Sequence, residues 1–204
     1  LEKDRTYWKD AYHTQPRFCF PAGRTPLNST AFTVTQTIRD PLYHRAAELA
    51  RTLGPGCSTY ALLVFIAAFT IYRITGRTNF ALHHMSHGRQ DAAARETIGA
   101  MINMFPVFFD LNPGATFREE LAKARNAYLE ALFHGRLSFH DLLMYTFREA
   151  LRNGFILNQA WMVLNNEDFA ASVASTPYEA ESFGARNQPH QFFCQLLENP
   201  AESL

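Results

Sequence analysis

Apolar residues recur at helical spacing in four parts of the chain, and most of these segments carry signals for a helix start or end. Asp40 is expected to cap the second segment and Gly54 to end it. Thr116 and Glu119 form a capping box at the start of the fourth. The predicted helices cover residues 2–11, 41–53, 58–75 and 116–132, with shorter helical stretches near 139–144 and 152.

The first helix is amphipathic. It is expected to pack Tyr7 and Trp8 and to expose Lys3, Asp4 and Lys9. A connector rich in proline and glycine follows it.

Strands are predicted where apolar and polar residues alternate and where short apolar runs lie between turns. The segment TNFALHH predicts a strand, with a loop from His83 to Asp91 leaving it. Pro106 lies inside another apolar run and implies an edge strand, a bulge or a strand start, because proline cannot donate to a ladder. The last strand has no evident partner, so the C-terminus is expected to be incomplete. The predicted strands cover residues 30–38, 78–84, about 102–111, 158–166 and 191–198.

Strands separated by helices predict an α/β sandwich with a mixed sheet flanked by helices. The 47% hydrophobic residues, with 18 Phe, can fill a substantial core. Nineteen basic and nineteen acidic side chains cancel, which argues against nucleic acid or anionic lipid as a partner. The longest apolar run, residues 60–69, falls short of the roughly 20 residues that span a bilayer. Three cysteines without CxxC spacing favour a reducing, cytoplasmic setting.

The segment FALHHMSHGRQD, residues 80–91, gathers His83, His84 and His87. On a helix two of them could share a metal, but on a strand His83 and His84 point to opposite faces, so no metal site is expected. A lone histidine could act as a general base if a partner fixed its tautomer. The alternative is a structural loop in which Arg89 makes an ion pair.

Asn103 and Gln159 are amides within apolar runs, so each needs a hydrogen-bond partner, either within the protein or on a ligand. No Gly-x-Ser-x-Gly elbow supports a serine hydrolase, and the cysteines lack a nucleophile context.

Four segments, in order, resemble the C-terminal half of the condensation domains of nonribosomal peptide synthetases: YWKD (7–10), TIGAMINMFPVFFDL (97–111), HGRLSFHDLL (134–143) and LNQAWMVLNN (157–166). Gly88 and Arg89 match a Gly-Arg landmark of the same family. The other matching positions are Tyr7, Trp8, Ile98, Gly99, Asn103, His134, Phe139, Gln159 and Asn166.

This resemblance implies one lobe of a two-lobe, chloramphenicol-acetyltransferase-like domain spanning residues 1–204. The domain forms amides in a tunnel between the lobes, from an acyl donor and an amine acceptor tethered to carrier proteins through phosphopantetheine. It implies no directly bound cofactor and no catalytic residue here, because the His-His-x-x-x-Asp-Gly motif belongs to an N-terminal lobe outside this chain. The expected partners are that lobe, upstream and downstream carrier proteins and an adjacent adenylation domain. The tunnel candidates are His84, Asn103, Gln159 and Asn166, and Gly88 and Arg89 are expected to be structural.

Several residues depart from the family pattern. Gly135 and Arg136 replace Gln and Asp, Met104 replaces Thr, and His83 and Met85 replace Gly and Pro. The alternatives are therefore a noncatalytic carrier-protein docking lobe, an epimerase, or an acyltransferase that uses coenzyme A.

Overall fold

A computed structural model describes residues 1–14, 41–54, 57–86, 88–89, 92–99, 101–142, 144, 160–165 and 192–197. Within these ranges, four strands form one mixed sheet in the order β2-β1-β3-β4. The predicted strand at 30–38, together with His87, Gln159 and Asn166, lies outside the described residues.

The sheet is built around β1 (Asn79–Ser86), which pairs antiparallel with β2 (Asn103–Asp110). On its other side β1 pairs in parallel with β3 (Ala160–Asn165), which pairs in parallel with β4 (Phe192–Leu197). β4 therefore has a strand partner, and the expectation that it lacks one is wrong. β2 lies at the edge of the sheet among the described strands, so of the three alternatives that Pro106 left open the structure has the edge strand.

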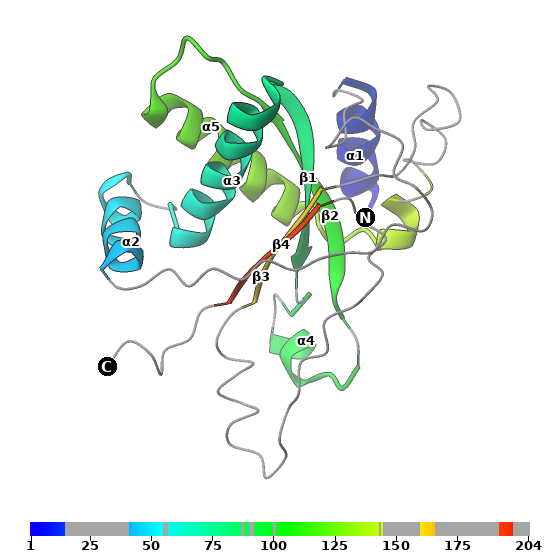
Figure 1. Cartoon of the computed structure of the whole chain (residues 1–204). Helices are drawn as coiled ribbons and strands as arrows, with labels where there is room; N and C mark the ends of the chain where they lie inside the picture. The colour runs from blue at the N-terminus through cyan, green and yellow to red at the C-terminus, as the bar shows by residue number, and fades with distance from the viewer. Residues whose placement is uncertain are drawn as a thin grey trace, which may run out of the picture.

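Two helices, α3 (Thr59–Thr75) and α5 (Phe117–Phe133), cover one face of β1 and β2 (Figure 1). Both have the ends that the sequence predicts. Ser58 caps α3 and Gly76 ends it in the left-handed conformation, and Thr116 and Glu119 form the capping box of α5. Between the helices and the sheet lies the apolar core. Its large, fully buried members include Leu62, Phe65, Phe80, Leu82, Phe105 and Val107.

Helix α1 (Glu2–Thr14) lies on the other side of β2 from α3 and α5 (Figure 1). Its Tyr12 ring meets Phe108 of β2 edge-on at 5.5 Å, and Trp8 is completely buried. Asp4 is also buried, so the expectation that it is exposed is wrong.

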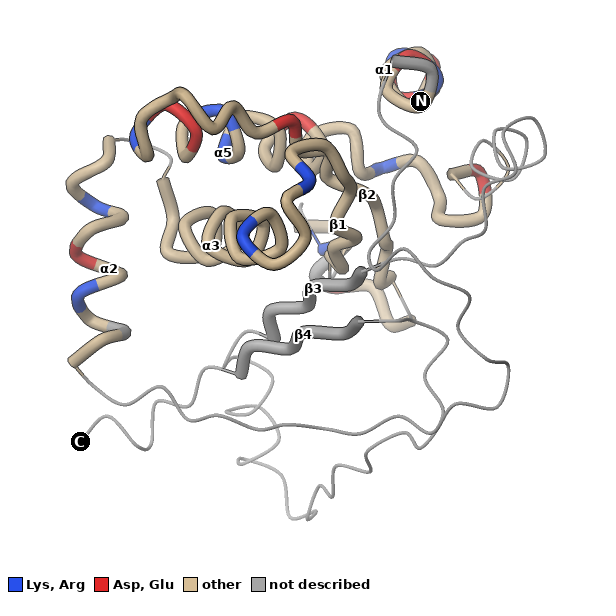
Figure 2. Tube along the Cα trace, turned by 45° about the horizontal axis from the view of Figure 1, so that its top comes forward, with Lys and Arg blue, Asp and Glu red and all other residues tan. Residues whose placement is uncertain are grey.

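Helix α2 (Leu42–Thr52) packs beside α3 and begins after Pro41, which makes no side-chain cap. The short helix α4 (Ala92–Glu96) lies between β1 and β2 in sequence, where only a loop was predicted. Basic and acidic residues are interspersed along α2 and α5 (Figure 2). No helix in the described part of the chain has the length and apolar character needed to cross a membrane.

Candidate functional site

The paired histidines lie within β1, which continues to Ser86, so the loop predicted to begin at His83 starts later. Pairing with β2 extends the strand, because His83 lies opposite Pro106 and His84 opposite Phe105. The strand sends the two side chains to opposite faces, as expected. His84 faces α3 and α5 and has no exposed surface.

His84 is held by aromatic neighbours. Its Nδ1 lies 2.8 Å from the Tyr60 hydroxyl, and its ring stacks on Phe105 with centroids 6.4 Å apart. Tyr128 of α5 meets the ring edge-on at 5.6 Å. Its Nε2 has no hydrogen-bond partner. Burial lowers the pKa of His84 to about 3, so the ring is neutral near pH 7. A fully enclosed neutral imidazole has no access to a substrate in this conformation, so we assign it a packing role.

The Gly-Arg pair after β1 holds a tight loop. Gly88 has φ of 69°, and a Cβ added there would overlap the carbonyl oxygen of Met101. The Arg89 guanidinium donates to the carbonyls of Thr97, at 2.6 Å, and Gly99, at 2.9 Å. These hydrogen bonds link the Gly-Arg pair to the start of the family-like segment at 97–111.

Asn103 begins β2 and holds the chain that follows α5. Its Nδ2 donates to the carbonyls of Gly135, at 2.6 Å, and Leu137, at 2.7 Å. The two amide hydrogens are thereby used within the protein, which is the structural alternative for this side chain.

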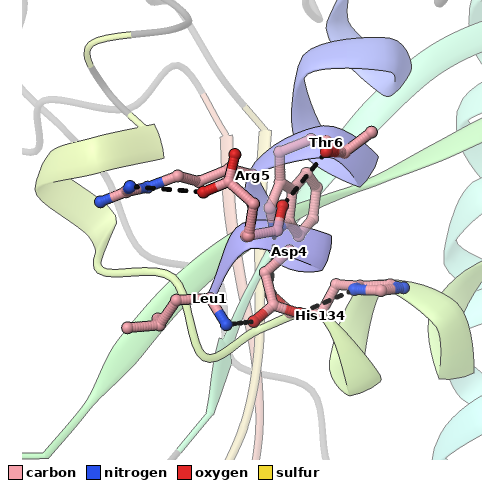
Figure 3. A network of polar contacts seen from close by, with 7 residues as sticks. Leu1, Asp4, Arg5, Thr6 and His134 are labelled. Carbon is pink, nitrogen blue, oxygen red and sulfur yellow. Dashed lines mark hydrogen bonds and ion pairs between the residues drawn. The ribbon is translucent and has the colours of Figure 1, made fainter.

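His134, the residue after α5, joins that loop to α1 (Figure 3). Its carbonyl accepts a hydrogen bond from Trp8 Nε1 at 2.9 Å, and its ring stacks on Tyr7 with centroids 4.1 Å apart. Its Nδ1 lies 2.8 Å from Oδ1 of Asp4. Three side chains of α1, those of Asp4, Tyr7 and Trp8, thus contact His134.

The Asp4 carboxylate is the charged centre of this junction. Burial would raise its pKa, but the hydrogen bond with His134 counteracts this, and the pKa is below its usual range. The carboxylate is therefore ionised at neutral pH and favours a donor at His134 Nδ1. Beside the junction is a hollow of about 410 Å³ whose lining carries both signs of charge. It is lined by Leu1, Glu2, Lys3, Asp4, Phe133, His134 and Arg136.

The structure thus brings together residues that sequence analysis placed in separate motifs. We name the group formed by Asp4, Tyr7, Trp8, Asn103 and His134 the junction cluster. Asp4 was missed as a member, although it lies one helical turn before the buried Trp8 and so shares its face. Among the described residues, no group of three His, Cys, Asp or Glu side chains is placed to hold a metal ion.

Comparison with known proteins identifies the family of this architecture. The family model described as "Condensation domain" matches residues 1–193. The chain belongs to the condensation-domain family. Condensation domains have the chloramphenicol-acetyltransferase-like fold, so the α/β fold class predicted from the sequence is confirmed.

Relatives of this condensation-domain chain include very large synthetases. A linear gramicidin synthase polypeptide of Brevibacillus parabrevis is 27% identical over 145 residues, covering 70% of this chain and 2% of that protein. Nonribosomal peptide synthetase acrB of Aspergillus aculeatus is 30% identical over 134 residues, covering 63% of this chain and 9% of that protein. The chain therefore spans a small part of the curated relatives it matches.

Solved condensation-type structures share the fold. The cyclization-docking bidomain of the EpoB synthetase from Sorangium cellulosum aligns with a TM-score of 0.62 at 18% identity, covering 80% of this chain and 34% of that one. The first condensation domain of the CDA synthetase aligns with a TM-score of 0.55 at 22% identity, covering 81% and 34%.

Proposed function

We propose that this chain is the C-terminal lobe of a condensation domain that forms amide bonds in nonribosomal peptide synthesis. The observation that carries the proposal is the junction cluster. Three of the four family-like segments, at 7–10, 97–111 and 134–143, meet there through hydrogen bonds of Trp8 and Asn103. Convergence of these segments on one loop is expected if they preserve a shared architecture, rather than matching by chance.

The proposed reaction is attack of an acceptor amine on the thioester carbonyl of an acyl donor, with the donor thiol as leaving group. Both substrates arrive on phosphopantetheine arms of carrier proteins, so no cofactor need bind this chain. Holding the amine near an activated carbonyl supplies much of the acceleration, and proton removal and oxyanion stabilisation add to it. We assign the proton transfer to the His-His-x-x-x-Asp-Gly motif of the N-terminal lobe.

This lobe then contributes shape and positioning. Asn103 fixes the loop after α5, and Arg89 fixes the loop between β1 and β2, so both act on the wall of the proposed tunnel rather than on the reacting atoms. His84 packs between β1 and the helices α3 and α5, where it contacts Tyr60 and Tyr128, and so supports β1 from the core. Gln159 and Asn166 remain tunnel candidates.

The test is an assay of the full-length protein with an acyl-loaded upstream carrier protein and an aminoacyl-loaded downstream one. We expect the amide to accumulate on the downstream carrier, measured by intact-protein mass spectrometry. The Asn103→Ala variant should slow its formation, whereas Asn126→Ala, at an exposed position of α5, should not. Failure of the wild-type protein to transfer any of several acyl groups would contradict an amide-forming role.

A noncatalytic carrier-docking lobe is the second candidate, and the packing around Gly135 favours it. A Cβ at this position would lie 3.1 Å from the Leu132 carbonyl oxygen and 3.2 Å from the Phe105 ring. The neighbouring atoms therefore leave little room for a side chain at position 135, where the family pattern has a glutamine. This candidate predicts that loaded carriers bind the full-length protein without any transfer.

Two related activities can be separated in the same assay. An epimerase would change the stereochemistry of the residue on a single carrier without joining two substrates. A coenzyme A-dependent acyltransferase would accept an acyl group from the free acyl-coenzyme A. Chiral analysis of the amino acid released from the carrier tests for the epimerase. Replacing the loaded upstream carrier by an acyl-coenzyme A tests for the acyltransferase.

A further inference from the structure

The backbone that leads into β2 is gripped by the turn that follows β1. The Arg89 guanidinium donates hydrogen bonds to the carbonyls of Thr97, at 2.6 Å, and Gly99, at 2.9 Å. Gly88 packs its backbone against the Met101 carbonyl, which a Cβ at position 88 would overlap. Two consecutive residues of the turn therefore hold three residues before β2. We name Thr97, Gly99 and Met101 the lead-in of β2.

The grip on the lead-in leaves little freedom of movement. A guanidinium is a planar fork with fixed angles between its donors, so the two carbonyls that Arg89 binds cannot shift independently while both hydrogen bonds remain. Gly99 has φ of 148°, a conformation that residues with a side chain rarely adopt. The path of the lead-in therefore depends on the guanidinium and on a glycine together.

The far end of the lead-in is tied to the loop that follows α5. Asn103 begins β2, and its Nδ2 donates to the carbonyls of Gly135, at 2.6 Å, and Leu137, at 2.7 Å. Only Ile102 separates Met101 of the lead-in from Asn103. A displacement of the lead-in would therefore reach Asn103 through bonded backbone, and the loop at 134–137 through two short hydrogen bonds.

The loop at 134–137 in turn holds α1. The carbonyl of His134 accepts a hydrogen bond from Trp8 Nε1 at 2.9 Å, and its Nδ1 lies 2.8 Å from Oδ1 of Asp4 (Figure 3). A continuous path thus runs from the turn after β1, across the start of β2, to the first helix. Each of its steps is a hydrogen bond, a packing contact or a short run of bonded backbone.

We propose that Arg89 is a positioning residue for the loop at 134–137, and that it acts through the lead-in and Asn103. This inference rests on the proposed function, because it takes that loop as part of the wall that holds the substrates. It adds that Arg89 and Asn103 act as one unit rather than fixing two separate loops. A small misplacement far from the reacting atoms can cost a large factor in rate, so the grip of Arg89 is expected to matter for turnover.

Amide hydrogen exchange of the full-length protein tests the coupling. Arg89→Lys keeps the positive charge but loses the fork that reaches two carbonyls. The probes are the amides of His134 and Gly135, which donate to carbonyls of α5. We expect both to exchange at least ~5-fold faster in Arg89→Lys than in the wild type. The amide of Gly76, which donates to a carbonyl of α3, should keep its wild-type rate.

The matched control is Arg118→Lys, at an exposed position in the first turn of α5. It makes the same chemical change on the helix whose last turn carries the probes, and it should leave all three rates unchanged. Wild-type rates at positions 134 and 135 in Arg89→Lys would overturn the proposal. An equal rise at position 76 would show general destabilisation and would also overturn it.

A double variant tests whether Arg89 and Asn103 act as one unit. Asn103→Ala removes the link between the lead-in and the loop at 134–137. Adding Arg89→Lys to Asn103→Ala should then change exchange at positions 134 and 135 by less than ~2-fold. If the double variant shows the full effect of Arg89→Lys again, Arg89 acts by another route and the proposal fails.

Kinetics of the full-length protein with loaded carriers connect the coupling to the reaction. Per folded molecule, Arg89→Lys should lower kcat about 10-fold and change KM for either carrier by less than ~2-fold, because it shifts the wall and not the carrier. Exchange needs no catalysis, so an inactive wild type with coupled exchange rejects the proposed function and keeps the coupling. An active wild type whose Arg89→Lys variant has unchanged exchange and kcat rejects this inference alone.

Discussion

The carboxylate of Asp4 and the imidazole of His134 meet at 2.8 Å although 130 positions separate them in the chain. The contact ties the first turn of α1 to the residue that follows α5. Helix α1 lies beside the edge strand β2, away from α3 and α5 in the view of Figure 1, so this hydrogen bond ties α1 to the end of α5 (Figures 1 and 3).

Loss of this contact should destabilise the protein. A hydrogen bond that involves a charged group contributes about 1.5–3 kcal/mol, and Asp4→Ala also leaves the largely buried His134 Nδ1 without its acceptor. We expect a fall of that size in the free energy of unfolding measured in urea. Glu2→Ala, which removes an exposed carboxylate 3.7 Å from Arg5, is the matched control and should cost less than about 1 kcal/mol. Equal effects of the two variants would contradict the assigned role.

The Asp4 contact should also depend on pH in a defined direction. The pKa of Asp4 is below its usual range in the folded protein. Its stabilisation is therefore fully present above the unfolded pKa, about 4, and is lost as the pH falls through the lower folded pKa. The difference in unfolding free energy between wild type and Asp4→Asn should shrink over that acidic window. A difference that grows on acidification would show the opposite sign of pKa shift.

The sequence predicted what local signals determine. The helix predicted over residues 58–75 is present as α3, with Ser58 as its cap, and the predicted Thr116 capping box starts α5, because caps depend on residues within one turn. Pro106 narrowed its strand to an edge strand, a bulge or a strand start for the equally local reason that it lacks an N–H group.

Long-range contacts could not be predicted in the same way. The spacing places Asp4 on the helix face of Trp8, but its partner His134 lies 130 positions away in the chain, so the contact itself was not evident. Strand β1 continues beyond its apolar residues 80–82 because β2 pairs with it as far as Ser86. The two hydrogen bonds of Asn103 likewise join segments more than thirty residues apart in sequence, so only the need for a partner was evident.

Two substitutions of Asn103 should differ in how strongly they destabilise the protein. Asn103→Ala removes two hydrogen bonds, which should lower the unfolding free energy by about 1–3 kcal/mol. Asn103→Asp should cost more, because it directs carboxylate oxygens at the carbonyls of Gly135 and Leu137. Urea unfolding measures both, with Asn126→Asp at an exposed position as the control. An Asp variant as stable as wild type would contradict the donor role of Nδ2.

Gly88 and Gly76 form a matched pair for separating backbone strain from steric overlap. Both have φ of 69°, but a Cβ at position 76 meets no atom within 4 Å, whereas one at position 88 overlaps the Met101 carbonyl. Left-handed backbone costs a non-glycine residue about 1–2 kcal/mol, which Gly76→Ala should show. Gly88→Ala should lose about 1–3 kcal/mol more, measured by thermal or urea unfolding. Equal losses would show that the loop after β1 yields without cost.

His84 should give the protein a second, separate dependence on pH. Burial lowers its folded pKa to about 3, whereas the unfolded pKa is about 6.5, so the unfolded state binds one more proton between these values. Stability must then fall as the pH drops below about 6.5, at up to about 1.4 kcal/mol per pH unit, or roughly 2 kcal/mol between pH 7 and pH 5.

Replacing the imidazole isolates this contribution. His84→Phe cannot gain a proton, so its unfolding free energy should lack that part of the decline between pH 7 and pH 5, even though the Tyr60 hydroxyl loses its partner and stability at pH 7 falls. His140→Phe, at an exposed position, is the control. The comparison uses the pH slope rather than the absolute stability, so it separates the buried charge from altered packing. A variant with the wild-type slope would show that His84 becomes protonated within the folded core, and that the core opens to admit the proton.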